Sequence, residues 1–203
     1  MIVVGLTGGI ASGKSTISKI LEGNGIPVID VDRISREIVK PESLALNSIK
    51  NEFGNDVIAR NGELDRKKLA GIVFKDARKL ESLNAITLPI IKEEIRKILN
   101  CYKAEECKLC IVDAAILIEA GFTDIVNYII LVYVDSKVQL QRLMQRDNFS
   151  KEDALLRINS QMTFENKSKY ADFILDNSKD IEYTKQQINK ILKEIALSEE
   201  IDV

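Results

Sequence analysis

Residues 8–15 read Gly8-Gly9-Ile10-Ala11-Ser12-Gly13-Lys14-Ser15. They match the pattern G-x-x-x-x-G-K-[ST], in which the backbone N–H groups of a tight, glycine-rich turn form a nest for phosphate oxygens. In this pattern Lys14 reaches the outer phosphates of a nucleotide, and the Ser15 hydroxyl is a ligand of the Mg²⁺ ion that bridges them. The alternative is an ordinary tight turn, because so short a pattern also occurs by chance in unrelated chains.

The segments on both sides of this loop favour the nucleotide site. Ile2–Leu6 predicts a short buried strand, and Lys14–Glu22 predicts a helix whose N-terminus faces the phosphates. A second apolar strand at Ile26–Asp30 follows the helix stop at Asn24-Gly25. This strand–helix–strand unit implies a parallel pair with a right-handed crossover, whose ligand binds beyond the carboxyl ends of the strands.

Two carboxylates, Asp30 and Asp32, fall at that edge of the predicted sheet. Residues two apart in an extended segment share a face, so we expect both side chains to point toward the phosphate loop. The alternative is that they cap the helix predicted at Arg33–Val39, which would explain one of them.

Residues 41–108 interrupt the alternation of strands and helices. Helical patterns cover Leu44–Phe53, Val73–Ala85 and a long amphipathic stretch from Pro89 to about Lys103. This predicts a helical insertion between the second and third strands. Arg66 lies at a helix start in this region, where it either contacts an anionic substrate or forms a surface ion pair.

Three further strands complete the predicted sheet, at Lys108–Asp113, Tyr128–Val134 and Asp172–Asn177. Asp113 ends the first of these at the ligand edge, where a carboxylate commonly holds magnesium through water. An amphipathic helix at Ile181–Ala196 closes the chain, and we expect the tail over residues 198–203 to be frayed.

Two short helices that carry arginines are predicted between the fourth and fifth strands. The first places Gln139, Arg142 and Arg146 on one face, and the second contains Arg157. We interpret the pair as a lid that closes over the phosphates, brings positive charge to the transition state and expels water. The alternative is an exposed pair of helices with ordinary ion pairs, such as Arg146 with Asp147.

Composition narrows the function classes. The 203 residues, 45% of them hydrophobic, allow one domain with a substantial core, and a net charge of −2 gives no basic field for nucleic acid. No apolar run is long enough to span a bilayer and nothing resembles a signal peptide, so we expect a cytoplasmic protein. The absence of histidine excludes serine–histidine and cysteine–histidine nucleophiles. We interpret Cys101, Cys107 and Cys110 as reduced thiols rather than a metal or redox site.

An ordered series of short motifs resembles the dephospho-coenzyme A kinase family of P-loop kinases. The series is Leu6-Thr7-Gly8-Gly9-Ile10, Val28-Ile29-Asp30-Val31-Asp32, Leu64-Asp65-Arg66, Asp113 with Leu117 and Glu119, Gln139-x-x-Arg142-x-x-x-Arg146, Ala154-x-x-Arg157-Ile158-x-x-Gln161, and Ala171-Asp172 with Asn177. The phosphate loop alone is common to many kinases and ATPases. The ordered series extends over almost the whole chain and is far more specific.

This resemblance implies an α/β P-loop kinase fold, with a five-stranded parallel sheet in the order 2-3-1-4-5 flanked by helices. It implies one kinase domain over residues 1–203, with a core of about 1–32, 108–135 and 166–203. A helical coenzyme A-binding subdomain would span about 33–107, and the lid about 136–165. The implied reaction transfers the γ-phosphoryl group of ATP, with Mg²⁺, to the ribose 3′-hydroxyl of dephospho-coenzyme A. The partners would be these small molecules, without nucleic acid or membrane, and we expect a monomer, an oligomer being the alternative.

The resemblance also implies roles for individual residues. Asp32 would be the base or orienter of the ribose hydroxyl, Lys14 and Arg142 would complete the catalytic set, and Asn177 lies where the family meets the adenine of ATP. The residues expected to bind the nucleotide are Gly8, Gly9, Ala11, Ser12, Gly13, Lys14, Ser15, Thr16 and Asn177. The residues expected to bind the acceptor are Asp32, Arg66, Leu117 and Glu119.

The chain departs from the family pattern at three positions. The family often has His-Pro where this chain has Leu88-Pro89, usually a proline at the position of Ala115, and a glycine in place of Ala11. The first two departures lie on the acceptor side and leave the details of acceptor contact open.

Two rival functions follow from the same loop. One is a P-loop kinase of a nucleoside monophosphate or a small alcohol. The other is a non-catalytic nucleotide switch, which the sequence favours less because Asn166-Lys167-Ser168-Lys169 lacks the aspartate of a guanine-binding motif.

Overall fold

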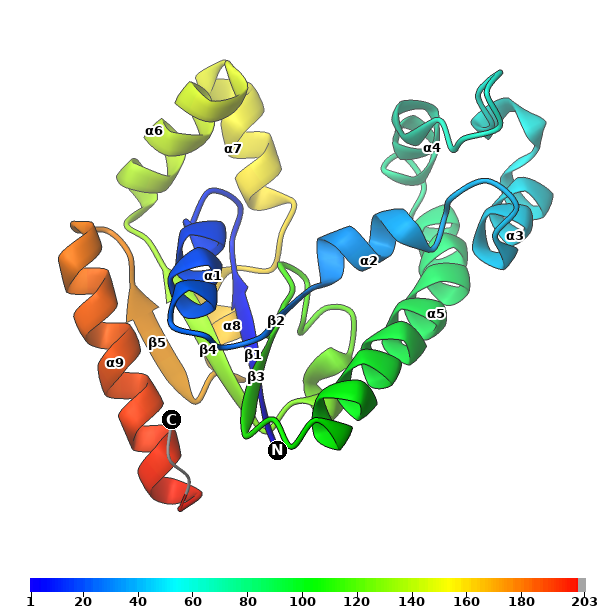
Figure 1. Ribbon diagram of the computed structural model, residues 1–203. Helices are drawn as coiled ribbons and strands as arrows, with labels where there is room; N and C mark the ends of the chain where they lie inside the picture. The colour runs from blue at the N-terminus through cyan, green and yellow to red at the C-terminus, as the bar shows by residue number, and fades with distance from the viewer. Residues whose placement is uncertain (201–203) are drawn as a thin grey trace. The chain divides into compact units, whose positions relative to one another are not determined.

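The computed structural model describes residues 1–200, and its central element is a parallel β-sheet (Figure 1). Strand β1 (Ile2–Gly8) pairs with β3 (Leu109–Asp113) on one side and with β4 (Tyr128–Tyr133) on the other. β4 also pairs with β5 (Phe173–Asp176), and β2 (Val28–Asp30) lies beside β3. The resulting order β2-β3-β1-β4-β5 confirms the predicted sheet.

Helices α1 (Lys14–Gly23) and α9 (Ile181–Ser198) share one hydrophobic core with the sheet (Figure 1). Alternate residues of the strands face these helices, since successive side chains of a strand point to opposite faces. Each fully buried aliphatic side chain contributes roughly 1.5–3 kcal/mol relative to exposure. The buried members of this core are Ile2, Val4, Leu6, Ile17, Leu21, Ile26, Leu109, Ile111, Ile130, Val132, Leu175, Ile188, Ile191, Leu192 and Ile195.

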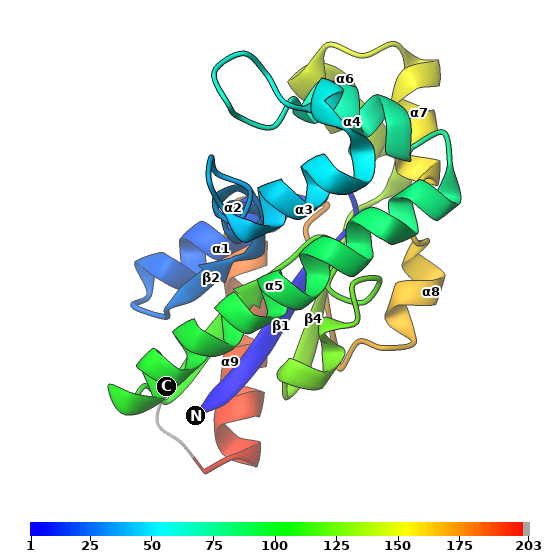
Figure 2. The same cartoon turned by 90° about the vertical axis from the view of Figure 1, so that its right-hand side faces the viewer.

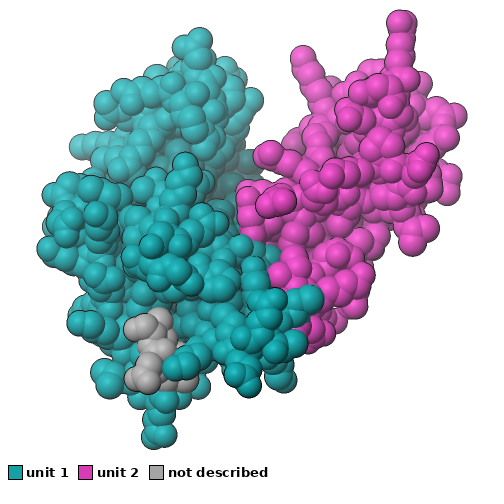
Figure 3. Space-filling model, viewed as in Figure 1, with its two compact units in different colours: residues 1–29, 101–203 teal, residues 30–100 magenta. Residues whose placement is uncertain are grey.

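The described residues group into two compact units, which Figure 3 distinguishes by colour. One contains Met1–Ile29 and the chain from Cys101 onward, and the other is Asp30–Asn100. The second unit contains the helices α2 (Val31–Glu37), α3 (Leu44–Phe53), α4 (Arg66–Val73) and most of α5 (Ala77–Ala104), with a short 3₁₀ helix η1 (Asn55–Val57).

The helix boundaries predicted around Pro89 are wrong. α5 extends from Ala77 to Ala104 with Pro89 inside it. Figure 2 shows α5 as one continuous helix. A proline inside a helix removes one N–H bond and costs about 3 kcal/mol, so packing elsewhere along the helix has to compensate. Buried residues recur on one face of α5 after the proline, at Ile91, Ile95 and Leu99.

The helix predicted over Val73–Ala85 is also wrong, because the structure has a break between two helices where the sequence predicted one continuous helix. α4 ends at Val73, and a new helix begins only at Ala77. The side chain of Asp76 accepts a hydrogen bond from the N–H of Arg78 at 3.0 Å, as a residue just before a helix does. The sequence gives no signal for this break, because the helical spacing of apolar residues continues across it and no glycine or proline lies there.

The segment between β4 and β5 contains the two predicted helices and a third. These are α6 (Ser136–Asp147), α7 (Lys151–Asn159) and the short α8 (Phe164–Ser168), which has too few residues for its period to be recognised in the sequence. Another 3₁₀ turn, η2 (Phe122–Ile125), precedes β4. The last helix, α9, extends to Ser198, two residues beyond its predicted end, and residues 201–203 of the tail expected to fray lie outside the described residues.

All three cysteines have free thiols. Cys110 is buried in β3, and this burial raises the pKa of its thiol to about 12, which makes it a small core residue without nucleophilic character. Among residues 1–200, none of the helices combines the length and the apolar character that crossing a membrane requires.

Candidate active site

The phosphate loop connects β1 to α1 at the carboxyl edge of the sheet. Gly13 has φ +88°, in the left-handed region, and a Cβ at this position would collide with Nδ2 of Asn177, so only glycine fits. Ala11 adopts φ +58° although it carries a Cβ. No side chain of the described residues caps α1, so the N–H groups of its first turn are available to a phosphate.

The Lys14 ammonium is held by the end of the neighbouring strand β3. It forms an ion pair with Oδ1 of Asp113, the last residue of β3. Ser18, one turn further along α1, donates from Oγ to Oδ2 of Asp113 at 2.5 Å. Asp113 therefore orients Lys14 in this structure, and its predicted contact with magnesium through water stays a prediction.

Sequence reasoning missed Ser18. Its side chain is buried with that of Asp113. The sequence does contain a signal, because residues four apart lie on the same face of a helix and Ser18 therefore follows Lys14 toward the sheet.

Three amide side chains bind the backbone of the loop. Nε2 of Gln139, in α6, donates to the carbonyl of Ile10 at 2.8 Å, and Oε1 of Gln161 accepts from the N–H of Ile10 at 2.7 Å. Asn177 follows β5 and donates from Nδ2 to the carbonyl of Ser12 at 2.8 Å. Its Oδ1 accepts from the Thr184 hydroxyl at 3.0 Å. Asn177 thus fixes the loop, and its expected contact with adenine stays a prediction.

Arg142 lies beside the phosphate loop. A Cβ built on Gly13 would be 3.6 Å from Nη1 of Arg142. Within the described part of the chain, this guanidinium makes no ion pair or hydrogen bond with another residue. Arg142 is therefore a cation available to a ligand at the loop.

The other two arginines between β4 and β5, Arg146 and Arg157, have partners within the same segment. Arg146 forms two hydrogen bonds with Asp147, Nε to Oδ1 at 2.9 Å and Nη2 to Oδ2 at 2.8 Å. These bonds raise the pKa of the Arg146 guanidinium and lower that of the Asp147 carboxyl. Arg157 stacks over the ring of Phe149, 3.8 Å from its centroid. The ion pair considered as an alternative for Arg146 is confirmed.

The segment after β3 is fixed by a lysine that sequence reasoning did not assign to the site. Nζ of Lys167, in α8, donates to the carbonyl of Ala115 at 2.8 Å and lies 2.9 Å from Oε1 of Glu119. The Thr7 hydroxyl also donates to the carbonyl of Ala115, at 3.1 Å. A lone lysine in a polar stretch gives no signal for this role, because its partners are about 50 residues away in the sequence.

Leu117, in the same segment, is completely buried. A Cβ on Gly5 would lie 2.6 Å from its Cδ1, so the leucine packs directly on the backbone of β1. Leu117 is a packing residue in this structure. The acceptor contacts expected of Leu117 and Glu119 stay predictions.

The unit Asp30–Asn100 contains the remaining predicted residues. Asp30 caps α2, since its side chain accepts a hydrogen bond from the N–H of Arg33 at 2.9 Å. This confirms, for one of the two aspartates, the alternative that they cap the helix. The premise that Asp32 continues an extended segment is wrong, since α2 begins at Val31 and places Asp32 in its first turn. Asp32 is exposed, and its role stays a prediction.

Arg66 begins α4 and donates from Nη2 to the carbonyl of Arg36 at 3.4 Å. It lines an apolar cavity of about 250 Å³ within its own unit. The other lining residues include Val39, Ile49, Leu64, Leu69, Val73, Leu83 and Ile91.

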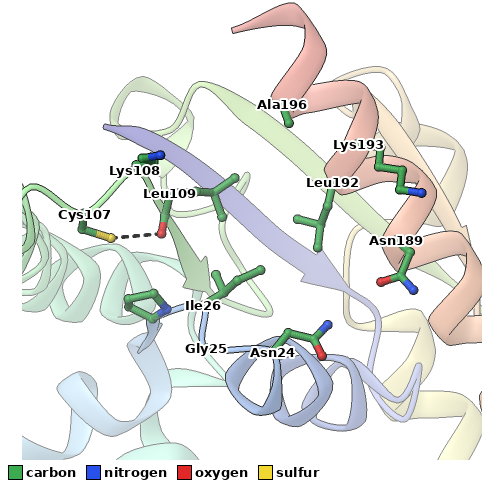
Figure 4. Close-up of a pocket in the computed structure, with 11 residues that line it drawn as sticks. Asn24, Gly25, Ile26, Cys107, Lys108, Leu109, Asn189, Leu192, Lys193 and Ala196 are labelled. Atoms are coloured by element: carbon green, nitrogen blue, oxygen red, sulfur yellow. Dashed lines mark hydrogen bonds between the residues drawn. The ribbon is translucent and has the colours of Figure 1, made fainter. Parts of the chain in front are cut away.

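Two cavities of the first unit lie at opposite ends of the sheet. One, of about 340 Å³, lies beside the phosphate loop and is lined by residues that include Gly9, Ser12 and Gln139. The Ser12 hydroxyl is buried and has no hydrogen-bond partner among the described residues. The other, of about 630 Å³, lies where β3 starts and α1 ends, with Leu109 and Leu192 among its walls (Figure 4). Only the first belongs to the site.

The comparisons with known proteins agree on one family. The model of the dephospho-CoA kinase family matches residues 2–183. A dephospho-CoA kinase of Carboxydothermus hydrogenoformans is 44% identical over 191 residues, covering 94% of this chain and 93% of that protein. One of Bacillus anthracis is 44% identical and covers 95% of this chain and 96% of that protein.

Solved structures extend this agreement to the fold. A dephospho-CoA kinase from Campylobacter jejuni has a TM-score of 0.72 at 30% identity and covers 97% of this chain and 98% of that one. A shikimate kinase from Bacteroides thetaiotaomicron has a TM-score of 0.55 at 13% identity, covering 96% of this chain and 98% of that one, and shows likeness of fold alone.

Proposed function

The chain belongs to the dephospho-CoA kinase family, and we propose that it transfers the γ-phosphoryl group of ATP to the ribose 3′-hydroxyl of dephospho-coenzyme A, giving coenzyme A and ADP. One observation carries the proposal beyond family membership. In the phosphate loop, Lys14 is oriented by Asp113. Arg142, which has no ion-pair or hydrogen-bond partner among residues 1–200, lies beside Gly13, so two cations converge on one anion-binding turn.

The nucleotide is bound by the loop and by the N-terminus of α1. Phosphoryl transfer requires mainly positioning and neutralisation of charge on the transferred group, which Lys14 and Arg142 supply from opposite elements. Removing one such preorganised donor typically lowers turnover about 10²–10³-fold. Residues 136–165 act as the lid, with Arg142 as its catalytic contribution.

Mg²⁺ is the proposed metal of the reaction. The hydroxyl of Ser15 would be a direct ligand and the carboxylate of Asp113 would hold the ion through water, since Mg²⁺ takes hard oxygen donors and keeps several waters. The described residues contain no group of three His, Cys, Asp or Glu side chains that could hold a metal. The ion would therefore be shared with the nucleotide phosphates, and when bound it would neutralise charge on the β- and γ-oxygens.

The unit Asp30–Asn100 is proposed to bind the acceptor. Its apolar cavity beside Arg66 offers both a nonpolar wall and a cation. The carboxylate of Asp32 is exposed and would accept the proton of the ribose hydroxyl or orient that hydroxyl.

We also propose a cytoplasmic monomer. The three unpaired thiols fit a reducing compartment. Light scattering of the purified protein measures whether its mass is that of one chain.

The test of the reaction is a turnover assay with ATP, Mg²⁺ and dephospho-coenzyme A. The product should gain the mass of one phosphate, and AMP, CMP, UMP and dTMP should be poor acceptors. Preferred transfer to one of these monophosphates would favour the rival kinase function, and binding of GTP without turnover would favour a nucleotide switch.

The role of Asp32 is tested by Asp32→Asn, which keeps the shape of the side chain and removes its charge. Loss of a general base typically costs 10²–10⁴-fold, so turnover should fall by at least about 10²-fold while the Kd of ATP stays nearly unchanged. Asp30→Asn is the matched control, because asparagine caps a helix as well as aspartate does. Near-normal turnover in Asp32→Asn would remove this residue from the mechanism.

A further inference from the structure

We propose that Gln139 and Gln161 are positioning residues that clamp the peptide groups of Ile10 and thereby couple the lid to the phosphate loop. Both hydrogen-bonding groups of the Ile10 backbone are bound by lid side chains, the carbonyl by Nε2 of Gln139 and the N–H by Oε1 of Gln161. The inference rests on the proposed function, because the lid matters only where a nucleotide is held.

The phosphate loop depends on such external contacts. Within the loop, the N–H of Ser12 donates to the carbonyl of Gly9 at 3.1 Å, and that of Thr16 to the carbonyl of Gly13 at 2.9 Å. Neither of these bonds involves Ile10. A loop that must hold its N–H groups in a fixed nest needs its remaining backbone groups satisfied, and the two glutamines supply one acceptor and one donor.

Gly9 provides independent support for the clamp. The phosphate-loop pattern requires glycine at positions 8 and 13 but not at 9. The backbone of Gly9 has no positive φ that would require glycine. A Cβ at this position would lie 3.0 Å from Nε2 of Gln139 and 3.7 Å from Oε1 of Gln161. A side chain at position 9 would therefore crowd the amide of Gln139, and glycine leaves room for it.

The clamp also positions Arg142. Gln139 and Arg142 are three residues apart in α6 and so share a face of that helix. When Gln139 binds the carbonyl of Ile10, the same face is held against the loop, and Nη1 of Arg142 lies beside Gly13. Gln161 fixes the other end of the lid, two residues beyond the end of α7.

The test uses Gln139→Met and Gln161→Met, which keep the length of the side chain and remove its hydrogen bonds. Gln141→Met is the control, because this exposed glutamine lies on the same helix. We expect kcat to fall about tenfold in Gln139→Met, the effect of one well-placed hydrogen bond, with the KM for dephospho-coenzyme A unchanged. In an Arg142→Ala background the same substitution should change kcat by less than about twofold, because residues that act as one unit are not additive.

A readout without turnover separates the clamp from the proposed reaction. Hydrogen exchange at the Ile10 amide, followed by NMR, should be slow in the wild type, faster in Gln161→Met, and slow again in Gln161→Glu, which keeps the acceptor. The wild-type turnover assay alone decides the identity of the acceptor, so that failure of the proposed reaction is seen separately.

Three outcomes would overturn the clamp. Additive losses in Gln139→Met and Arg142→Ala would show that Gln139 does not act through Arg142. A lower melting temperature with unchanged kcat would reduce both glutamines to structural residues. Tighter ATP binding in Gln161→Met would show that Gln161 competes with the phosphates for the Ile10 N–H.

Discussion

Two lysine–carboxylate pairs in the same unit differ in which partner is the more buried. In the pair at the phosphate loop, the side chains of Lys14 and Asp113 are 12% and 8% exposed. In the pair between α8 and the segment after β3, Lys167 is 1% exposed and Glu119 is 25% exposed. The carboxylate is the more buried partner in the first pair, and the ammonium in the second.

This difference predicts a functional role for the Lys14 ammonium and a structural role for that of Lys167. The carboxylate of Asp113 is fixed by Ser18, so the ammonium of Lys14 is oriented and still partly accessible to a ligand. The ammonium of Lys167 donates hydrogen bonds to the carbonyl of Ala115 and to the carboxylate of Glu119, and it is buried by these contacts. Removing one partner of a buried pair leaves an uncompensated charge, whose cost depends on whether water can reach it.

The largest effect predicted from this contrast is on turnover in Lys14→Met. We expect kcat to fall about 10²–10³-fold, because the phosphates lose a preorganised cation in a site of low dielectric. Lys19→Met is the control, since Lys19 is exposed on the same helix. Steady-state kinetics with ATP and dephospho-coenzyme A measure the effect. Wild-type turnover in Lys14→Met would contradict the functional role of Lys14.

The second prediction concerns Lys167→Met, which should act on stability first. The segment from Ala115 to Glu119 loses its anchor, but Glu119 can be hydrated, so we expect a loss of about 2–3 kcal/mol in the free energy of unfolding. Chemical denaturation measures this value. The fall in kcat should be far smaller than in Lys14→Met, and Lys169→Met, at the exposed C-cap of α8, is the control. An equal collapse of kcat would make Lys167 functional as well.

The third prediction sharpens the role of the carboxylate at the loop. Ser18→Ala removes the hydrogen bond to Oδ2 of Asp113 and should cost about 1.5–3 kcal/mol of unfolding free energy, as bonds to charged groups do. The kcat should also fall, because Asp113 then holds Lys14 less firmly. Ser168→Ala, which removes a hydroxyl bonded to the backbone carbonyl of Glu165, is a suitable control. An unchanged kcat would show that Lys14 needs no orientation beyond the ion pair.

Of the two pairs, the sequence allowed a prediction for Lys14 but none for Lys167. Lys14 lies in a local pattern whose eight positions are contiguous, so its chemistry could be predicted. Lys167 gains its role from Ala115 and Glu119, about 50 residues earlier, and no local period reports such a contact. The same reason hid the bonds of Gln139 and Gln161 to Ile10, although both glutamines belong to motifs that the sequence shares with the family.

The fold was predicted more fully than the helix boundaries. The strands are continuous apolar runs, and the parallel order follows from their alternation with helices and from the family resemblance. The errors lie where tertiary packing decides, as in the passage of α5 through Pro89. The break between α4 and α5 is a second error. A third is the helix start at Val31, which places Asp32 in a helix and not in an extended segment.

The smallest predicted effect, on the loop that presents Lys14, comes from Ala11→Gly. Ala11 adopts φ +58°, and a residue with a Cβ is disfavoured there relative to glycine by about 1 kcal/mol. The substitution should therefore raise the free energy of unfolding by up to about 1 kcal/mol, measured by chemical denaturation. Ala85→Gly in the exposed middle of α5 should lower it by about as much, since a helix favours alanine. If Ala11→Gly lost stability as Ala85→Gly does, the left-handed turn at position 11 would not be strained, and the loop would hold Lys14 without stored backbone energy.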